Sequence, residues 1–377
     1  MVERVLYEME QAYRSCVWDL PDDFLSYDRF YTCLRKLDRT SSPGYPYMRE
    51  ASTIGDWLKW DGAWYDPVRI EHLWFDVQAV LRKDYEMVLR LFIKSEPHKE
   101  EKVRDNRWRL IIASPLCVQM VWHMLFSYQN DLEIENSYYI PSQQGFVPVN
   151  GGWQLYLASW RERGYDTGLD KKAWDWNVPG WLLDIELMFR RRMGRGRCME
   201  QWNSIAQWLY DQMFGSPIIV TSSGLLLKQL YPGIMKSGCV NTISSNSHMQ
   251  VIVHIAACVE TGVDIHPLPV ACGDDTLQRL DQAVDLEAYA RYGAVVKSAS
   301  AGLEFVGHEF LDSGPQPLYF AKHLEKFKHV PSEVLPDYLD SMARMYCHNP
   351  VLFEFWVYAA YELGNSRALM SRAAYLY

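Results

Sequence analysis

Apolar residues recur every three or four positions in several stretches of the chain, which is the spacing of one helix face. The first long stretch covers residues 68–92, and we expect it to be helical through Val88 and Leu89. Residues 331–377 have the same periodicity and predict a small terminal helical domain. Residues 1–39 are compatible with helix. Their aromatic side chains are interpreted as core: Tyr7, Tyr13, Trp18, Phe24, Tyr27, Phe30 and Tyr31.

Shorter apolar runs bounded by turn residues predict hairpins. Val270–Cys272 leads into Gly273 and Asp274, which predicts a short hairpin with Asp274 and Asp275 at its tip. Residues 92–111 predict a longer hairpin, whose return strand places Arg107 and Arg109 on one face. Residues 303–311 predict a third hairpin, and residues 293–297 a strand.

Two segments combine a turn with the start of a helix. Residues 164–177 predict a strand that ends at Asp170, a turn that holds Asp175, and a helix capped by Asn177. Asp175 as no more than a helix cap is the alternative. Residues 232–246 predict a loop that enters a helix, where Thr242 and Asn246 share one face.

The composition favours a compact globular protein of two or three subdomains, since 49% of its 377 residues are hydrophobic and 14% aromatic. The net charge of −9 is unexpected for a nucleic-acid-binding protein, so any such surface has to be local. Residues 94–109 hold six basic and four acidic side chains, enough for a triphosphate or an RNA backbone. A solvated charged hairpin is the alternative. The arginines between 190 and 197 are interpreted as a solvated helix end, with template contact as the alternative.

The eight cysteines have no zinc-like spacing and predict free thiols in a reducing compartment. Cys347 and His348 have no second metal-binding pair nearby. The first 20 residues lack the apolar core of a signal peptide, and no apolar run approaches the roughly 20 residues of a membrane span. We therefore expect a soluble protein.

The adjacent carboxylates of Asp274 and Asp275 repel each other unless they are fully solvated or bind a divalent cation such as Mg²⁺. Taken alone, this Gly-Asp-Asp tip could be an exposed turn, and the proline-rich loop at residues 40–47 an ordinary surface turn. The rest of the chain decides between these interpretations.

Taken in order, the motifs resemble those of viral RNA-dependent RNA polymerases of positive-strand RNA viruses. They are closest to the sobemovirus-like and barnavirus-like group, with kinship to the picornaviral enzymes. The motifs are Thr-Ser-x-x-Gly-Tyr-Pro from Thr40, the basic hairpin, Asp-x4-Asp from Asp170, Ser-Gly-x3-Thr-x3-Asn from Ser237, Gly-Asp-Asp and a lysine before a turn. The resemblance covers residues 40–311.

The resemblance implies an α+β fold of the right-hand polymerase type, with an antiparallel palm sheet flanked by helices. It places the fingers at residues 1–160 and 191–232, the palm at 161–190 and 233–312, and the thumb at 313–377. Residues 305–308 depart from the pattern, because many relatives have a basic primer-grip turn there.

The resemblance also implies the roles of individual residues. Two Mg²⁺ ions, with Mn²⁺ able to substitute, would be held by Asp170, Asp274 and Asp275, with Lys297 as general acid. The ribose 2′ hydroxyl would be sensed by Asp175 and Asn246, helped by Ser237 and Thr242. The incoming triphosphate would meet Lys94, Lys102, Arg107 and Arg109, with Glu96 as a structural partner within the same hairpin. Template RNA would contact Ser41, Ser42, Gly44 and Gly238.

The implied activity is template-directed RNA synthesis from NTPs. A non-catalytic RNA-binding replicase subunit of the same fold is the alternative, and reverse transcription is a third. The implied partners are template and nascent RNA, NTPs, other replicase proteins and, where initiation is protein-primed, a genome-linked protein. The implied location is the host cytoplasm, in membrane-associated replication complexes.

Overall fold

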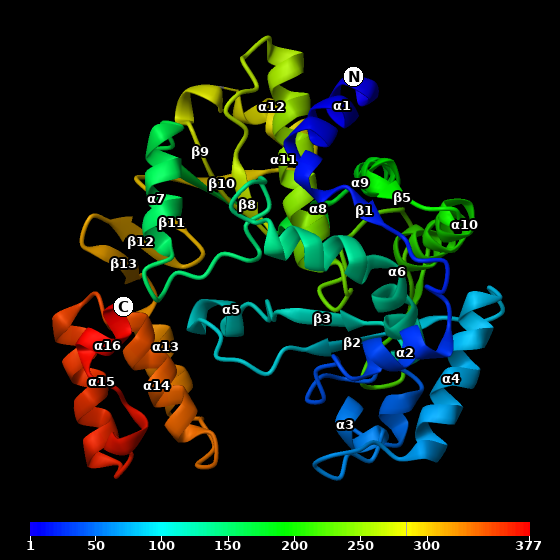
Figure 1. Ribbon diagram of the computed structural model, residues 1–377, viewed down its shortest axis with the longest axis horizontal. Coiled ribbons are helices and arrows are strands. Elements are labelled where there is room, and N and C mark those ends of the chain that lie inside the picture. The colour runs from blue at the N-terminus through cyan, green and yellow to red at the C-terminus, as the bar shows by residue number, and fades with distance from the viewer. Residues whose placement is uncertain (284) are drawn as a thin grey trace.

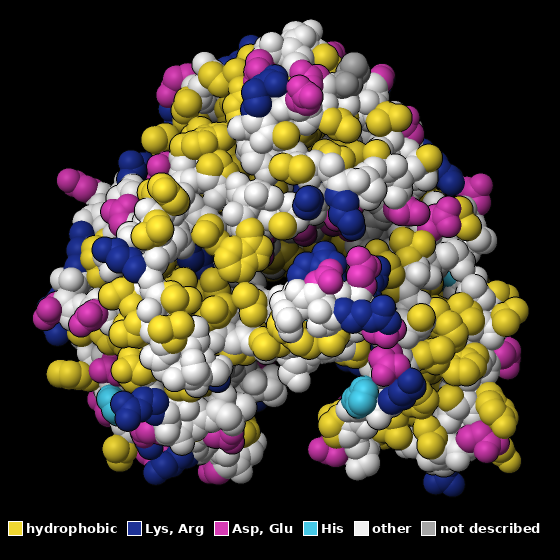
Figure 2. Space-filling model, turned by 180° about the vertical axis from the view of Figure 1, so that it is seen from behind, with side chains coloured by type: hydrophobic (Ala, Val, Ile, Leu, Met, Phe, Trp, Pro, Cys, Tyr) yellow, Lys and Arg dark blue, Asp and Glu magenta, His cyan; other side chains and the backbone are white. Residues whose placement is uncertain are grey.

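The structure is a computed structural model that describes residues 1–283 and 285–377 (Figure 1). A central body lies at the top of Figure 1, and two lobes extend below it. The first lobe contains α2 to α4 and a sheet, and the C-terminal lobe contains α13 to α16. The space-filling view from behind shows an open notch between these two lobes (Figure 2).

The central body is built on an antiparallel four-stranded sheet with the order β10-β4-β9-β8. Its strands are β4 (Thr167–Lys171), β8 (Val270–Cys272), β9 (Asp275–Gln278) and β10 (Val296–Ala301). The Gly-Asp hairpin is confirmed, because Cys272 pairs with Asp275 and leaves a two-residue loop whose Gly273 has φ +66°. The predicted strand at 293–297 begins later, at Val296, and runs further.

Helices cover this sheet. Helix α11 (Thr242–Thr261) packs against β8, and α12 (Leu286–Arg291) against β10. The helix predicted after residue 232 is thereby confirmed. Helices α1 (Val2–Ala12) and α9 (Gly180–Met193) pack against α11, which leaves residues 244–258 of α11 buried on all sides. The other helices of the body are α7 (Trp153–Glu162), α8 (Trp174–Asn177) and α10 (Met199–Tyr210).

The sheet of the first lobe has the order β3-β2-β6-β7. Its strands are β2 (Val88–Ile93), β3 (Leu110–Ala113), β6 (Ile218–Val220) and β7 (Leu226–Lys228). The predicted long hairpin is confirmed, since β2 and β3 are antiparallel and enclose α5 (Glu100–Arg104). Arg107 and Arg109, however, come just before β3 and not within it. The helical prediction for Val88 and Leu89 is wrong, because α4 ends at Leu81 and Lys83 takes a left-handed φ of 62° that breaks the helix.

The remaining helices of the first lobe are α2 (Tyr27–Leu34), α3 (Ile54–Trp57) and α4 (Pro67–Leu81). Helices α2 and α4 pack on α6 (Leu116–Glu135), which extends towards the central body. The two-residue strands β1 (Trp18–Asp19) and β5 (Gly194–Arg195) pair in parallel. Of the aromatic residues expected in the core near the N-terminus, Tyr13, Trp18, Phe24 and Phe30 are buried, but the prediction is wrong for Tyr7 and Tyr27, which are exposed.

The third predicted hairpin is confirmed as β11 (Glu304–Phe305) and β12 (His308–Leu311), which β13 (Gly314–Pro317) extends. The C-terminal lobe that follows is helical, as predicted: α13 (Phe320–Phe327), α14 (Leu335–Tyr346), α15 (Pro350–Glu362) and α16 (Arg372–Leu376). A groove of about 1270 Å³ separates α13 and α14 from residues 93–98 of the long hairpin.

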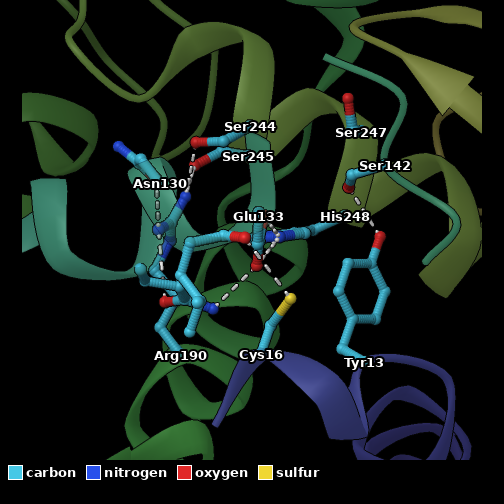
Figure 3. A network of polar contacts seen from close by, with 12 residues as sticks. Tyr13, Cys16, Asn130, Glu133, Ser142, Arg190, Ser244, Ser245, Ser247 and His248 are labelled. Carbon is cyan, nitrogen blue, oxygen red and sulfur yellow. Dashed lines mark hydrogen bonds and ion pairs between the residues drawn. The ribbon is translucent and has the colours of Figure 1, made fainter. Parts of the chain in front are cut away.

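A buried ionic network fixes the helices beneath the sheet (Figure 3). Arg190 is fully buried and donates to Glu186 of its own helix (2.6 Å) and to Ser244 of α11 (2.7 Å). His248 lies between two carboxylates, at 2.8 Å from Glu186 and 2.8 Å from Glu133 of α6. The interpretation of residues 190–197 as a solvated helix end is therefore wrong for Arg190, which joins α6, α9 and α11 in the interior.

Within the described ranges, no helix is both long and apolar enough to cross a membrane. The eight cysteines are free thiols in the structure of these residues.

Candidate active site

Asp170 and Asp274 lie at adjacent strand ends of the central sheet. Leu169 of β4 pairs with Thr276 of β9, so Asp170 comes next to the hairpin that bears Asp274 at its turn. Both aspartates are exposed. The sheet thus brings together two carboxylates that are far apart in the sequence.

Lys297 forms an ion pair with the first of these carboxylates, with its Nζ 2.8 Å from Oδ2 of Asp170. The pairing of β10 with β4 shifts register between Val296 and Ser298, so Lys297 sits at a β-bulge. A bulge re-aims the side chain of its extra residue, which explains how Lys297 reaches Asp170. The hydrogen bond and the charge of Asp170 raise the pKa of Lys297.

Asp275 has a different environment from its neighbour. Its Oδ2 accepts a hydrogen bond from the backbone N–H of Val306 (2.6 Å), in the turn between β11 and β12. Burial raises the pKa of Asp275 to about 6, against the lowering effect of the Val306 bond and of Lys171. Asp275 therefore ties the hairpin that bears Asp274 to the 305–308 turn, while Asp170 and Asp274 stay open to solvent.

Lys171 is a residue of this site that sequence reasoning missed. Its side chain is buried, and Nζ donates to the carbonyl of Leu169 (3.2 Å) and to the hydroxyl of Thr276. Burial lowers the pKa of Lys171 to about 7, although the charges of Asp275, Asp274 and Asp170 oppose that shift. The alternation along β4 could have revealed it, because Lys171 shares a strand face with Leu169.

Asp175 and Asn246 contact each other directly. The Asn246 side-chain nitrogen donates to Oδ1 of Asp175 (2.9 Å), and the indole N–H of Trp174 donates to the Asn246 oxygen (2.9 Å). The indole thereby fixes which end of the Asn246 amide faces the carboxylate. Burial raises the pKa of Asp175, while the Asn246 bond and the charge of Arg109 lower it.

Neither Asp175 nor Asn177 caps α9, so the predicted Asn177 cap is wrong. Both lie in α8, and the N-cap of α9 is Pro179. Asn177 donates to the carbonyl of Lys172 instead. Ala173, in the turn between Asp170 and Asp175, holds a left-handed φ of 48°, a conformation that costs an alanine free energy.

The loop before α11 is fastened to β3. Ser237 donates to the carbonyl of Leu110 (3.1 Å), and the N–H of Gly238 to the carbonyl of Ile112 (3.1 Å). A Cβ at Gly238 would lie 2.5 Å from that carbonyl oxygen, so the close approach requires glycine. Thr242 donates to the carbonyls of Lys236 and Cys239, which closes the loop.

The predicted template loop lines a cavity of about 740 Å³ together with Ser237 and Gly238. Ser41 and Ser42 face this cavity, and Ser42 accepts a hydrogen bond from Arg90 (3.1 Å), which sequence reasoning missed. Gly44 lies behind it, with φ +69° and no room for a Cβ against the carbonyl of Ser114. Its role in the structure is close backbone packing.

The cations of the long hairpin are unequally placed. Glu96 binds both Arg109 (2.7 Å) and Lys94 (3.0 Å), as the proposed structural partner would. Arg107 pairs with Asp105 (2.6 Å), and Lys102 lies in the exposed helix α5. The effect of Arg109 on the pKa of Asp175 shows that Arg109 is within electrostatic reach of the site.

The donor set suits Mg²⁺, which prefers carboxylate oxygens and retains water ligands. Asp170 and Asp274 present such oxygens to solvent at neighbouring strand ends. Across the described part of the chain, no three His, Cys, Asp or Glu side chains are gathered closely enough to form a metal site by themselves. One oxygen of Asp170 is occupied by Lys297, and Asp275 is turned towards Val306.

Comparison with solved structures identifies the class of fold. The Sicinivirus 3Dpol RNA-dependent RNA polymerase superposes with a TM-score of 0.72, covering 98% of this chain and 83% of that chain at 15% sequence identity. The fold is therefore the right-hand polymerase fold of the α+β class, as the sequence predicted.

The chain belongs to the family of viral RNA-dependent RNA polymerases, whose family model matches residues 28–302. Protein P1-P2 of Pea enation mosaic virus-1 (strain WSG) is 31% identical over 347 residues, 82% of this chain and 28% of that protein. The RNA-directed RNA polymerase of Mushroom bacilliform virus (isolate Australia/AUS LF-1) is 30% identical over 271 residues, 68% of this chain and 63% of that protein. The replicase polyprotein P2AB of Southern bean mosaic virus (isolate Bean/United States/Arkansas) is 31% identical over 315 residues, 78% of this chain and 31% of that protein. The chain thus spans about a third or less of the first and third of these relatives.

Proposed function

We propose that the chain catalyses template-directed RNA synthesis, transferring nucleotidyl groups from NTPs to a growing RNA 3′ end with release of pyrophosphate. The observation that carries this proposal is the meeting of Asp170, Asp274 and the Asp175–Asn246 pair at one end of the central sheet. A module that only binds RNA has no need of exposed carboxylates near such a pair.

Two Mg²⁺ ions held by Asp170 and Asp274 would lower the pKa of the primer hydroxyl and neutralise charge on the leaving pyrophosphate. Asp275 supports these residues by holding the hairpin against Val306. Lys297 is the candidate proton donor to pyrophosphate, because a lysine ammonium is charged at neutral pH.

The Asp175–Asn246 pair would recognise the ribose 2′ hydroxyl. A hydroxyl can donate to the Asp175 carboxylate and accept from the Asn246 amide, whereas a deoxyribose leaves both groups without that partner. Ser237 and Thr242 support the pair by closing the loop at the start of α11. Selection of NTPs over dNTPs, which distinguishes this activity from reverse transcription, follows from this arrangement.

The triphosphate would bind Arg109 and Lys94, which pair with Glu96 until the nucleotide arrives. Lys102 and Arg107 on the outer half of the hairpin would add positive charge that attracts NTPs. Template RNA would pass through the cavity lined by Ser41, Ser42 and Gly238, with Gly44 shaping its wall. With these assignments, the proposed fingers are residues 1–160 and 191–232, the palm is residues 161–190 and 233–312, and the thumb is residues 313–377.

The proposed partners are template and nascent RNA, NTPs and other replicase proteins, with a genome-linked protein where initiation is protein-primed. We also propose that the protein works in membrane-associated replication complexes of the host cytoplasm. Support for the other replicase proteins as partners comes from the replicase polyprotein P2AB of Southern bean mosaic virus, of which the matched region is only 31%.

The test is Mg²⁺-dependent incorporation of labelled NTPs and dNTPs on a primed RNA template, comparing the natural chain with Asp274→Ala. We expect NTP incorporation that disappears in the variant, and little use of dNTPs. The matched control is Asp312→Ala, which removes an exposed aspartate that pairs with Arg161 and belongs to none of the proposed contacts. RNA binding without incorporation, equal in all three proteins, would instead establish the non-catalytic replicase subunit.

A further inference from the structure

The hairpin that bears Asp274 is held by contacts along both strands. The backbone of Ala271 in β8 bonds to Pro141 and Gln143, and Asp275 in β9 bonds to Val306. These contacts fix the base and one side of the hairpin. The turn itself, Gly273 and Asp274, projects beyond the last strand pair.

Ser247 of α11 reaches this turn. Its Oγ accepts a hydrogen bond from the backbone N–H of Gly273 (2.9 Å) and donates its own proton to the carbonyl of Ile243 (2.8 Å). A hydroxyl has one proton and two acceptor sites. The bond to Ile243 uses the proton and fixes the orientation of the hydroxyl, which leaves an acceptor site for the N–H of Gly273. The side chain of Ser247 is completely buried.

Ser247 stands on a helix whose position is tightly fixed. The next residue, His248, lies between Glu133 and Glu186, and the preceding residue, Asn246, binds Asp175. Figure 3 shows His248 pointing into the buried network while Ser247 lies apart from it. Three consecutive residues of α11 thus connect the ionic interior, the turn of the catalytic hairpin and the proposed ribose-sensing pair.

We propose that Ser247 is a positioning residue of the active site, whose hydroxyl holds the Gly273-Asp274 turn at a fixed place relative to Asp170 and to the Asp175–Asn246 pair. The proposal rests on the proposed function. Without the hydroxyl, the N–H of Gly273 loses its partner, and a turn built on a left-handed glycine can shift. Displacement of a reacting group by about 1 Å can lower a rate by about 10²-fold.

The first test compares Ser247→Ala with the natural chain in single-nucleotide incorporation. We expect kcat to fall about tenfold to hundredfold while KM for the NTP stays within about twofold, because the triphosphate contacts lie elsewhere. Ser247→Thr keeps the hydroxyl and should recover most of kcat. If the added methyl group lowers the melting temperature, Ser247→Cys, which matches serine in shape and has a weak sulfur acceptor, should give an intermediate rate.

The matched control is Thr261→Ala on the same helix. Thr261 makes the same bond to the carbonyl four residues earlier (2.8 Å), but it is exposed at the C-terminal end of α11. The kcat of Thr261→Ala should equal that of the natural chain.

Two measurements without nucleotide report on the turn directly. Hydrogen exchange of the Gly273 amide, followed by glycine-selective ¹⁵N labelling, should accelerate at least tenfold in Ser247→Ala and not in Thr261→Ala. Binding of Mn²⁺, measured from the signal of free ion by electron paramagnetic resonance, should weaken several-fold in Ser247→Ala. If Ser247 only stabilised the fold, Ser247→Ala would lower the melting temperature without a selective change in Gly273 exchange or in Mn²⁺ affinity.

Unchanged kcat, Mn²⁺ affinity and Gly273 exchange in Ser247→Ala would overturn the inference while leaving the proposed function in place. Equal losses in Ser247→Ala and Thr261→Ala would also overturn it. If the natural chain incorporates no nucleotide, the proposed function fails, and Gly273 exchange still decides whether Ser247 holds the turn.

Discussion

Two groups of acidic side chains lie near α11, one buried and one exposed, and their surroundings differ. Glu133 and Glu186 are buried with Arg190 and His248, which supply cations inside the protein. Asp170 and Asp274 are exposed at the sheet, where Lys297 pairs with Asp170 alone and Asp275 adds a third carboxyl group. The carboxylates of the first group are paired with cations of the protein, and this group holds helices together. The second group keeps negative charge that can bind ligands from outside.

The largest expected effect comes from removing a cation of the buried group. Arg190→Met leaves Glu186 without its main partner in the interior, and we expect the free energy of unfolding to fall by about 3–5 kcal/mol. The matched control is Arg192→Met on the same helix, whose exposed pair with Glu3 should contribute less than about 1 kcal/mol. Urea unfolding of both variants measures the difference, and equal losses would remove the contrast between the two groups.

The buried group should also give stability a defined pH dependence. Burial raises the pKa of Glu186, but Arg190 and His248 outweigh it and bring that pKa to about 2. The pKa of a glutamate in the unfolded chain is about 4.3, above the folded value of Glu186. The contribution of Glu186 to the free energy of unfolding, about 3 kcal/mol, is therefore fully present above about pH 4.3 and is lost as the pH falls towards 2.

His248 acts in the opposite direction. Burial lowers its pKa, but Glu133 and Glu186 outweigh it, so the folded pKa lies above the usual value. Its contribution is present below about pH 6.5 and is lost as the pH rises through the folded pKa. Urea unfolding between pH 2 and 9 should show both slopes, and NMR should find a charged His248 at pH 6.5. A neutral His248 at that pH would contradict the assignment.

A smaller effect is expected where the two groups approach each other along α11. Asn246→Ala should lower the preference for NTPs over dNTPs by about tenfold to hundredfold, as expected for the loss of one or two buried hydrogen bonds. Competition between the two nucleotide classes in the incorporation assay measures it. Asn177→Ala, an exposed asparagine close by in α8, should leave the preference unchanged.

The smallest effect concerns the exposed hairpin. Glu96→Gln removes the carboxylate that binds Arg109 and Lys94 and should lower KM for NTPs by about twofold to fivefold at low salt. The change should vanish at high salt, since exposed charges are screened. Glu100→Gln, which disturbs only the pair with Arg104 on α5, serves as the control. A rise in KM for Glu96→Gln would show that Glu96 orients the cations more than it competes for them.

Features encoded within a few residues were predicted from the sequence. The Gly273-Asp274 turn, the helix that bears Thr242 and Asn246, and the C-terminal helices depend on local turn chemistry and periodicity. That Asp170 and Asp274 lie close together was predicted from the resemblance, because no local sequence pattern shows which strands are neighbours.

Features that depend on distant partners were missed. The sequence of α9 alone suggests that Arg190 is solvated, since its partners other than Glu186 lie on α6 and α11. The Asn177 cap failed because a second short helix, α8, intervenes before α9. Asp275 was grouped with Asp274, whereas burial, Val306 and Lys171 give it a different environment.

The buried bond between Lys171 and Thr276 has a consequence for how this sequence can change. Thr276→Val alone would take one of two hydrogen-bond acceptors from the buried Lys171 amine, and Lys171→Met alone would leave the buried Thr276 hydroxyl without this donor. The two substitutions together remove both polar groups, so each makes the other tolerable. Substitutions at positions 171 and 276 are therefore coupled: a change at either position alone is unfavourable until the other position changes as well.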